Sequence, residues 1–429
     1  MLLPRQHELR AELYEEVHAR PPESLVPPVR ASQVALLHPL GMDRAAPWEA
    51  LRQLCERYGV TLPPATASHF SADFGAFRLK WERHTEFTRW MAIVQGAGDD
   101  PFADPAIAAL PPDWLARLPG ELLVATHVAL LPAPDGEPDA TAIAERLFGG
   151  GQLIGAPLLG GRGFAFTDFR THADGFGRFV AYDHGTTSWQ AGRIVQRLLE
   201  IDTYRIMALL ALPVARALVP ALTESERELA EITASLIGSR DEDEPGLLER
   251  LTTMAAETES REAQHRYRFG ASAAYYDLVQ QRIVDLREGR IEGLPTFSEF
   301  TERRLAPAMN TCRAVARRQE QLAARIARAT QLLSTRVDLT RQQQNQALLA
   351  SMDRRARLQL RLQQTVEGLS VAAITYYVVG LIAYAVRGLG ALGLGVSYEV
   401  LVAASTPLVA LAVFLGMRQV RRRAVGHAD

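Results

Sequence analysis

Histidines and their acidic neighbours are the side chains in this sequence best suited to acid–base or metal chemistry. The chain has ten histidines, and none stands in an HExxH motif or another recognised metal-ligand spacing. His84 alternates with Glu82 and Glu86, so on a strand the three side chains would share one face and could meet a cation. The other interpretation, which we favour, is a solvated polar face of a half-buried strand.

Three further motifs fit structural roles better than catalytic ones. The segment GGGQLIGAPLLGGRG (149–163) lacks the Lys-Ser/Thr ending of a phosphate loop and the GxGxxG order of a dinucleotide fold, so it predicts a strand followed by a turn. HARPPE (18–23) would end a helix, because adjacent prolines favour an extended chain. His172 and Asp174 fall at an expected hairpin turn, and turn geometry alone explains the aspartate.

The sequence shows no nucleophile elbow and no other catalytic constellation. We therefore expect no catalytic residues and no cofactor, and spacing identifies no metal ligands. Cys55 and Cys312 stand far apart, which argues against a disulfide framework and fits a reducing compartment. A net charge of −2 argues against a nucleic-acid binder.

Two long uncharged stretches near the C-terminus predict membrane-spanning helices. Leu369–Val386 has 18 residues, enough for about 27 Å of helix, and Val400–Gly416 follows with a proline that membrane helices tolerate. Basic residues flank the pair on both outer sides, which predicts that these flanks lie in the cytoplasm and the glycine-rich loop between the helices lies outside. The flanking arginines are Arg354, Arg355, Arg357, Arg361, Arg418, Arg421, Arg422 and Arg423.

Polar residues beside and within these spans are the candidate site of the membrane part. Glu367 would lie at the cytoplasmic mouth of the first span and Glu399 at the outer mouth of the second. In an oligomer each glutamate would form a ring that attracts cations, whereas the alternative is that both are ordinary interfacial residues. Thr375 and Tyr376 could line a pore or form hydrogen bonds between helices.

The N-terminal part of the chain must position the remaining candidates. Strand-like runs occur at 29–37, 74–94 and 121–131, and Asp174-Gly175 predicts a hairpin between two further runs. Alternation within the second run predicts one shared face for Phe77, Leu79, Trp81, Arg83, Thr85 and Phe87. From about Ser188 the pattern becomes helical.

A very long helix is expected to follow, because neither proline nor glycine occurs between Pro307 and Gly368. Apolar residues recur along it at coiled-coil-like intervals, and we expect this seam to pack against copies of the same helix, against the preceding helices, or both. The seam comprises Val315, Leu322, Ile326, Ala329, Leu333 and Val337, and continues less regularly through Leu348, Met352 and Leu362.

These patterns predict an α+β cytosolic domain, a helical region, one very long helix and a C-terminal two-helix transmembrane hairpin. The expected segments are the α+β domain (1–185), the helical region (186–306), the long stalk helix (307–368), the first span (369–386), the external loop (387–399), the second span (400–416) and a basic cytoplasmic tail (417–429).

Seven segments distributed over nearly the whole chain also carry a resemblance. They are HARPPE, WERHTEFT, FTDFRTHADGFGR, GRIVQRLLEIDTYRIMALLALPVAR, YRFGASAAYYDLV, RRLAPAMNTC and NQALLASMDRRARLQLRLQQTVEGLSVAAITYYVVGL. In these segments the chain resembles a bacterial family of uncharacterised membrane-anchored proteins, domain of unknown function 3422. The resemblance implies a two-span membrane anchor and supplies no activity.

The layout is also similar to that of CorA-type magnesium channels, in which a cytosolic α/β domain precedes a very long helix, a second span and a basic tail. Such channels carry Gly-Met-Asn just after the first span, where this chain has RGLGALGLG. The likeness is therefore one of layout alone.

We expect a homo-oligomeric inner-membrane protein with both termini in the cytoplasm, associated through its long helix. Its function would be ion passage or sensing at the membrane. A membrane-tethered scaffold that binds cytosolic proteins is the alternative, and a tethered enzyme is a third hypothesis. The lipid bilayer is the expected partner in each case, and nucleic acid is not.

Overall fold

The computed structural model describes residues 6–10, 13–14, 20–39, 41–238, 243–390 and 398–425. The chain forms two compact units. The first unit comprises Met1–Gly238 and Glu249–Thr330, and the second comprises Ser239–Leu248 and Gln331–Asp429.

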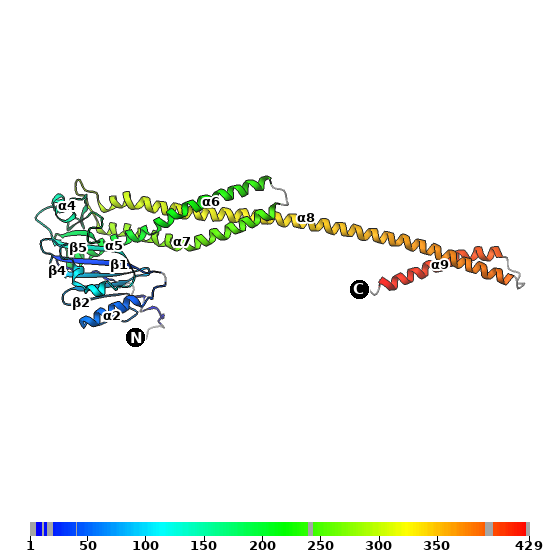
Figure 1. The fold of residues 1–429 in the computed structure, drawn as a ribbon, viewed down its shortest axis with the longest axis horizontal. Helices are drawn as coiled ribbons and strands as arrows, with labels where there is room; N and C mark the ends of the chain where they lie inside the picture. Colours follow the sequence, from blue (N-terminus) through cyan, green and yellow to red (C-terminus); the bar gives the residue numbers. More distant parts are fainter. Residues whose placement is uncertain are drawn as a thin grey trace. The chain divides into compact units, whose positions relative to one another are not determined.

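An eight-stranded mixed sheet forms the centre of the first unit (Figure 1). Its strand order is β2-β3-β4-β1-β5-β8-β7-β6, and the β5–β8 pair is parallel whereas the other pairs are antiparallel. The strands are β1 (Val29–Leu37), β2 (His69–Asp73), β3 (Arg78–Arg83), β4 (Phe87–Gln95), β5 (Glu121–Pro132), β6 (Ile154–Leu158), β7 (Gly163–Thr167) and β8 (Gly177–Asp183).

Helical segments cover both faces of this sheet, so the first unit contains an α/β sheet domain followed by long helices. One face is covered by α2, η1, α3 and α4, and the other face is covered by α5. The helical elements are α2 (Ala46–Tyr58), η1 (Ala106–Ala109), α3 (Pro112–Leu115), α4 (Ala140–Phe148), α5 (Ser188–Leu209), α6 (Ala211–Gly238), α7 (Glu244–Leu286), α8 (Phe297–Gly390) and α9 (Tyr398–Val425).

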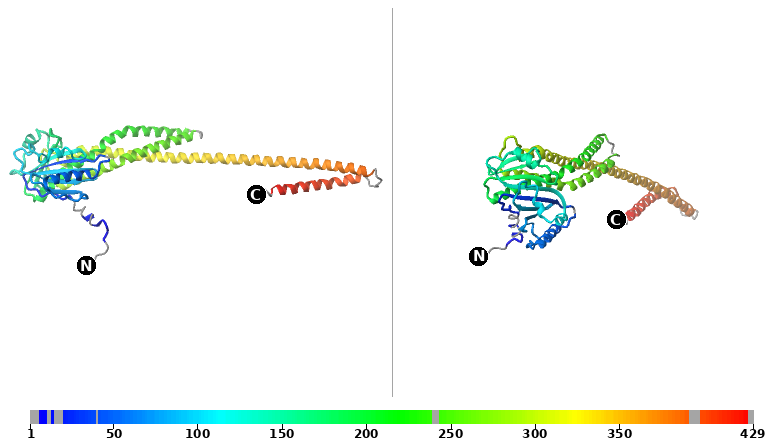
Figure 2. Two further views of the ribbon diagram at one scale, coloured as in Figure 1. Left: turned by 60° about the horizontal axis from the view of Figure 1, so that its bottom comes forward. Right: turned by 60° about the vertical axis from the view of Figure 1, so that its left-hand side comes forward.

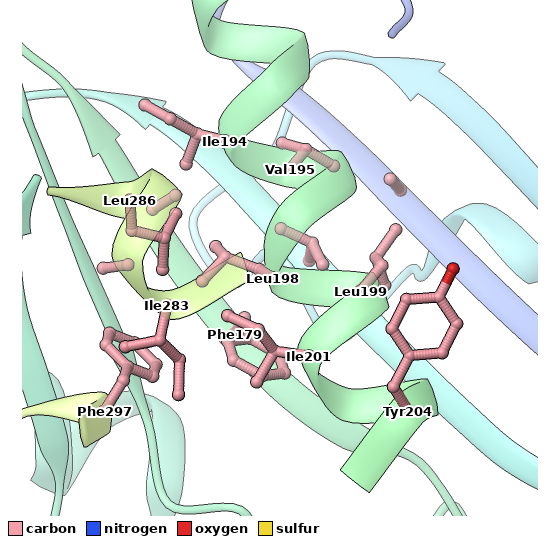
Figure 3. Packing of buried hydrophobic residues seen from close by; sticks show 14 of the residues in the cluster. Phe179, Ile194, Val195, Leu198, Leu199, Ile201, Tyr204, Ile283, Leu286 and Phe297 are labelled. Atoms are coloured by element: carbon pink, nitrogen blue, oxygen red, sulfur yellow. The ribbon is translucent and has the colours of Figure 1, made fainter. Parts of the chain in front are cut away.

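The largest core cluster lies between α5 and the sheet. The C-terminal end of α7 and the N-terminal end of α8 also contribute residues to it. Figure 3 shows Leu198 and Ile201 of α5 close to Phe179 of β8, with Ile283 from α7 and Phe297 from α8 beside them. Phe297 and Leu198 are completely buried. Burial of side chains of this size contributes roughly 1.5–3 kcal/mol each, so this cluster anchors the long helices to the sheet.

Local signals explain where α5 begins. Thr187 accepts a hydrogen bond from the Gln190 backbone amide, and the Gln190 side chain accepts one from the Thr187 amide, which is a capping box. The chain before β1 crosses the first turn of this helix, where the Leu25 amide donates to the Ser188 carbonyl at 3.0 Å. Gly192 permits this close approach, since a Cβ there would overlap the Glu23 carbonyl oxygen.

The hairpin predicted around Asp174-Gly175 is present, because β7 and β8 pair in antiparallel register. The strand-and-turn reading of residues 149–163 is also confirmed by β6 and the turn that follows it. The single face predicted for residues 77–87 is wrong in its second half, because the chain turns between β3 and β4. Phe77, Leu79 and Trp81 share one core cluster, whereas Phe87 lies in the cluster on the opposite face.

The long helix begins ten residues earlier than the stalk boundary at Pro307 that the sequence suggested. Thr296 and Glu299 form a second capping box: the Thr296 hydroxyl accepts from the Glu299 amide at 3.2 Å, and the Glu299 carboxylate accepts from the Thr296 amide at 3.2 Å. The helix therefore starts at Phe297, and Pro307 is accommodated inside it.

Helices α6 and α7 and the part of α8 in the first unit run side by side (Figures 1 and 2). Leu229 of α6, Met254 of α7 and Leu322 of α8 are all buried. Five members of the predicted seam are buried within this single chain: Val315, Leu322, Ile326, Leu333 and Val337. Farther along α8, Leu348, Met352 and Leu362 are exposed at 59%, 58% and 67%.

Three helical stretches are long and apolar enough to cross a membrane by length and composition: Ser188–Leu236, Phe297–Gly388 and Glu399–Gln419. In the apolar 18-residue window of Ser188–Leu236, a third of the residues are buried inside the chain. The α5 part of this stretch contributes to the core described above. None of the window is buried in the second and third stretches.

Candidate functional site

Two of the four candidate residues of the predicted membrane part share one pocket, and these two are neighbours in the chain. Thr375 and Tyr376 line an apolar pocket of about 470 Å³ on α8, and Thr406 of α9 borders the same pocket. The Thr375 hydroxyl oxygen is buried and has no hydrogen-bond partner among the described residues. The two predicted glutamates do not line this pocket: Glu367 is half-buried and accepts from Gln363 at 3.4 Å.

The predicted flanking residues lie on the same two helices. Glu399 is exposed in the first turn of α9. The four arginines on α8 and Arg418 on α9 are exposed as well, and Arg357 forms an ion pair with Asp353 at 2.6 Å. The side chains of Arg421, Arg422 and Arg423 lie outside the described residues, as does the greater part of the predicted external loop, residues 391–397.

The predicted solvated face around His84 is wrong, because Glu82 is only 2% exposed. Its carboxylate accepts from Arg89 Nε at 2.8 Å, and Lys80 Nζ lies 3.1 Å away. Burial alone would raise the pKa of Glu82, but the Arg89 guanidinium and the Lys80 ammonium hold that pKa well below its usual range. Glu82 is therefore a buried carboxylate anion held by two cations.

The alternative of a cation site on the same strand face also fails. His84 lies in the turn after β3, and Glu86 forms an ion pair with Arg268 of α7. Among the residues that the structure describes, no group of three or more His, Cys, Asp or Glu side chains is placed to hold a metal ion.

The buried charges continue from the sheet onto α5 and α7. Glu200 of α5 accepts from Gln196 at 2.9 Å, pairs with Arg282 of α7, and lies 3.7 Å from Arg89. A cavity of about 20 Å³, enough for one water molecule, lies beside this buried charge network, and Lys80, Glu82 and Arg89 are among the residues that line it. Because the cavity has no room for a substrate, the network fits a structural role that locks α5 and α7 onto the sheet.

The segment that HARPPE predicts as extended lies over this network. Lys80 Nζ donates to the Pro21 carbonyl oxygen at 2.6 Å, and Gln196 donates to the Arg20 carbonyl oxygen at 3.5 Å. Its prolines leave the carbonyl groups available as acceptors for buried donors. In the described part of the motif, residues 20–23, the backbone therefore satisfies Lys80.

A serine, a histidine and an aspartate meet on the other face of the sheet, and no motif in the sequence indicates this cluster. Ser32 Oγ lies 2.8 Å from His127 Nδ1, and Asp174 Oδ2 lies 3.8 Å from His127 Nε2. The three residues come from β1, β5 and the β7–β8 loop, so their sequence spacing carries no signal.

This trio is not built for catalysis. Ser32 is completely buried, and the Phe176 ring stacks on the His127 ring at 4.0 Å, which leaves no path for a substrate. Burial lowers the pKa of His127 to about 4, so the ring is neutral at pH 7. Asp174 accepts from the Phe176 amide at 3.0 Å, which confirms its predicted role in the turn.

The fold and these residues define a class of protein: an N-terminal α/β sheet domain followed by long helices, of which several are apolar enough to span a membrane. The chain belongs to the family described as Protein of unknown function (DUF3422), whose model matches residues 5–424. No curated protein matches the chain.

Proposed function

We propose that this protein is a homo-oligomeric, membrane-anchored sensor in which α8 transmits the state of a cytosolic α/β domain to two membrane-spanning helices. One observation carries the proposal: α8 is a single helix that begins in the core of the sheet domain at Phe297 and ends in an apolar stretch with no burial inside the chain. A continuous helix is the simplest element that can carry a displacement between two such regions.

Exposure of the apolar stretches supports their insertion in lipid. Leu369 and Leu381 of α8 are 73% and 69% exposed, and Leu408 of α9 is 68% exposed. A bilayer would cover these side chains. The arginine flanks support an inner-membrane location with both termini in the cytoplasm.

Exposure along α8 before the membrane stretch supports a homo-oligomer. Leu348 and Met352 lie one turn apart and are both exposed, and all residues from 341 to 366 on this helix are exposed. An isolated helix in water is marginally stable without packing of its apolar residues. Association of copies through this seam would bury it.

Light scattering of the detergent-solubilised full-length protein, corrected for detergent, tests the oligomer. We expect a mass of several subunits for the native chain and a lower mass for the double variant Leu348→Glu/Met352→Glu. The matched control, Gln346→Glu/Ala350→Glu, places the same charges on the opposite side of the helix and should keep the native mass. A monomeric native protein would reject the oligomer.

Ion passage is an alternative form of this proposal, and it depends on Glu367 and Thr375. A ring of subunits would bring the Glu367 carboxylates together at one mouth and the Thr375 hydroxyls together inside the membrane. Divalent-cation flux into proteoliposomes should then fall in Glu367→Gln and Thr375→Val. Absence of flux with the native protein would eliminate the conduit and leave the sensor.

A scaffold for cytosolic proteins is the second candidate, and a groove between α7 and α8 favours it. The groove has a volume of about 380 Å³, and Phe269, Met309 and Cys312 are among the residues that line it. Charged side chains at its rim, among them Glu262 and Arg313, suit an amphipathic partner helix. A chain ending at Leu362 should capture partners that Met309→Glu loses, and an empty capture from the folded chain would reject the scaffold.

A further inference from the structure

A pocket of about 480 Å³ opens at the end of the sheet where β1 ends and β3 turns into β4. Its lining is almost entirely basic, and it comes from four separate segments. Arg20 belongs to the segment before β1, His38 follows β1, Arg44 precedes α2, and the end of β3 with the turn after it supplies the rest. The lining residues are Arg20, His38, Arg44, Arg83, His84 and Thr85.

Acidic side chains near this basic pocket are committed elsewhere. Glu82 is bound by Arg89, and Glu86 is bound by Arg268. Within the described part of the chain, no carboxylate lines the pocket, and neither Arg44 nor Arg83 forms an ion pair. Arg44 and Arg83 therefore place two positive charges at the pocket, and both would attract an anion bound there.

Packing holds several of these donors in place. The Arg83 guanidinium lies over the Trp81 ring at 5.9 Å and reaches the Thr66 carbonyl oxygen at 3.5 Å. His84 stacks on the Phe87 ring at 4.3 Å, and its buried Nε2 lies 3.7 Å from the Glu82 carboxylate. The pocket therefore offers positioned guanidinium and imidazole groups rather than loose surface charges.

The two histidines add donors without adding charge. His38 Nε2 lies 2.7 Å from the Thr88 hydroxyl, which fixes the ring at the edge of the pocket. Burial is the main cause that lowers the pKa of both His38 and His84, and nearby arginines lower each pKa further. At pH 7 the charge of the lining therefore comes from Arg20, Arg44 and Arg83.

We propose that this pocket binds the phosphate group of a small anionic ligand, with the guanidinium groups of Arg44 and Arg83 as its principal ligands and Arg20 beside them. Guanidinium presents paired N–H donors that match phosphate oxygens, and a phosphate dianion can balance the charges of both Arg44 and Arg83, whereas a carboxylate can balance only one. The Thr85 hydroxyl and the imidazoles can supply further hydrogen bonds. The volume also accommodates a small organic group attached to the phosphate.

Titration calorimetry on the full-length protein in detergent, with inorganic phosphate as the probe, tests the site. We expect saturable binding that potassium chloride at matched ionic strength does not reproduce. Because Arg44 is exposed, Arg44→Gln should fold normally, and its affinity should fall roughly tenfold or more, as for loss of one charge-assisted hydrogen-bond donor. Arg83→Gln should have a similar effect.

The matched control is Arg78→Gln, at the opposite end of β3 from Arg83, which should leave the affinity unchanged. A second measurement tests whether the phosphate belongs to a soluble ligand or to a lipid headgroup. It compares the binding of the protein to phosphatidylcholine nanodiscs with and without phosphatidic acid. Binding that requires phosphatidic acid and is lost in Arg44→Gln would support the site with a lipid ligand. Absence of binding in both measurements, or equal binding by native protein and both pocket variants, would overturn the proposal.

Discussion

Arg89 is the residue on which the buried charge network depends most, because its guanidinium contacts the carboxylate of Glu82 and lies near that of Glu200. Removal of one partner from a buried pair leaves an uncompensated charge. We predict that Arg89→Leu lowers the free energy of unfolding by about 3–5 kcal/mol. The double variant Glu82→Leu/Arg89→Leu should lose much less than the sum of the two single variants.

Tryptophan fluorescence during denaturation is the measurement for this prediction, because all five tryptophans lie between Trp48 and Trp189 and therefore report on the sheet domain. Arg52→Leu is a control, since Arg52 pairs with glutamates on the surface of α2 and its loss should change little. Strictly additive losses for the Glu82 and Arg89 variants would contradict a coupled buried pair.

At the scale of the residue, we also predict that His127 makes the stability of the folded protein sensitive to acid. Its pKa is about 4 in the folded protein and about 6.5 in an unfolded chain, so the unfolded chain binds the extra proton between these values. Stability should therefore fall as the pH drops through this window, by about 2 kcal/mol between pH 7 and pH 5 for this residue alone. His127→Gln should show a shallower dependence of stability on pH, and an unchanged slope would show that His127 titrates normally.

At the scale of the element, two helical glycines distinguish the effect of a close contact between segments from the effect of helix propensity. A Cβ at Gly192 of α5 would overlap the Glu23 carbonyl oxygen, whereas a Cβ at Gly270 of α7 would meet nothing within 4 Å. We predict that Gly192→Ala costs about 1–3 kcal/mol or more, because the N-terminal segment must move. Gly270→Ala should instead stabilise the protein by about 0.5–1 kcal/mol.

Thermal unfolding followed by circular dichroism distinguishes these two variants, since both sit in helices and each adds one methyl group. A Gly192→Ala protein as stable as the native chain would show that the segment carrying Glu23 does not lie against α5. The same result would weaken the basic pocket, because that segment also carries Arg20.

Membrane topology is the prediction that belongs to the whole molecule. If α8 and α9 cross the bilayer with both outer flanks in the cytoplasm, Ser397→Cys should react with a membrane-impermeant thiol reagent in intact spheroplasts. Ala424→Cys should react only after the membrane is disrupted. The native Cys55 and Cys312 are buried, which keeps the background low. Labelling of both variants from outside would contradict the proposed orientation.

Features that depend on residues close together in the chain could be predicted from the sequence. The hairpin at Asp174-Gly175 and the two uncharged C-terminal stretches follow from local rules, in which a residue type at a given spacing favours one conformation. The start of α8 was missed although its signal, Thr296 with Glu299, is also local. The apolar seam of α8 was predicted as well, but its spacing could not identify which helices would cover it.

The two buried clusters and the basic pocket required the tertiary structure. Ser32, His127 and Asp174 come from three separate segments, and Arg20 and Arg83 line one pocket although they lie far apart in the sequence. The sequence by itself determined which stretches are apolar enough for helices and spans, since that depends on nearest neighbours along the chain. Only the packed sheet decided which charges are buried in pairs and which are left facing an open pocket, because that depends on distances between segments far apart in sequence.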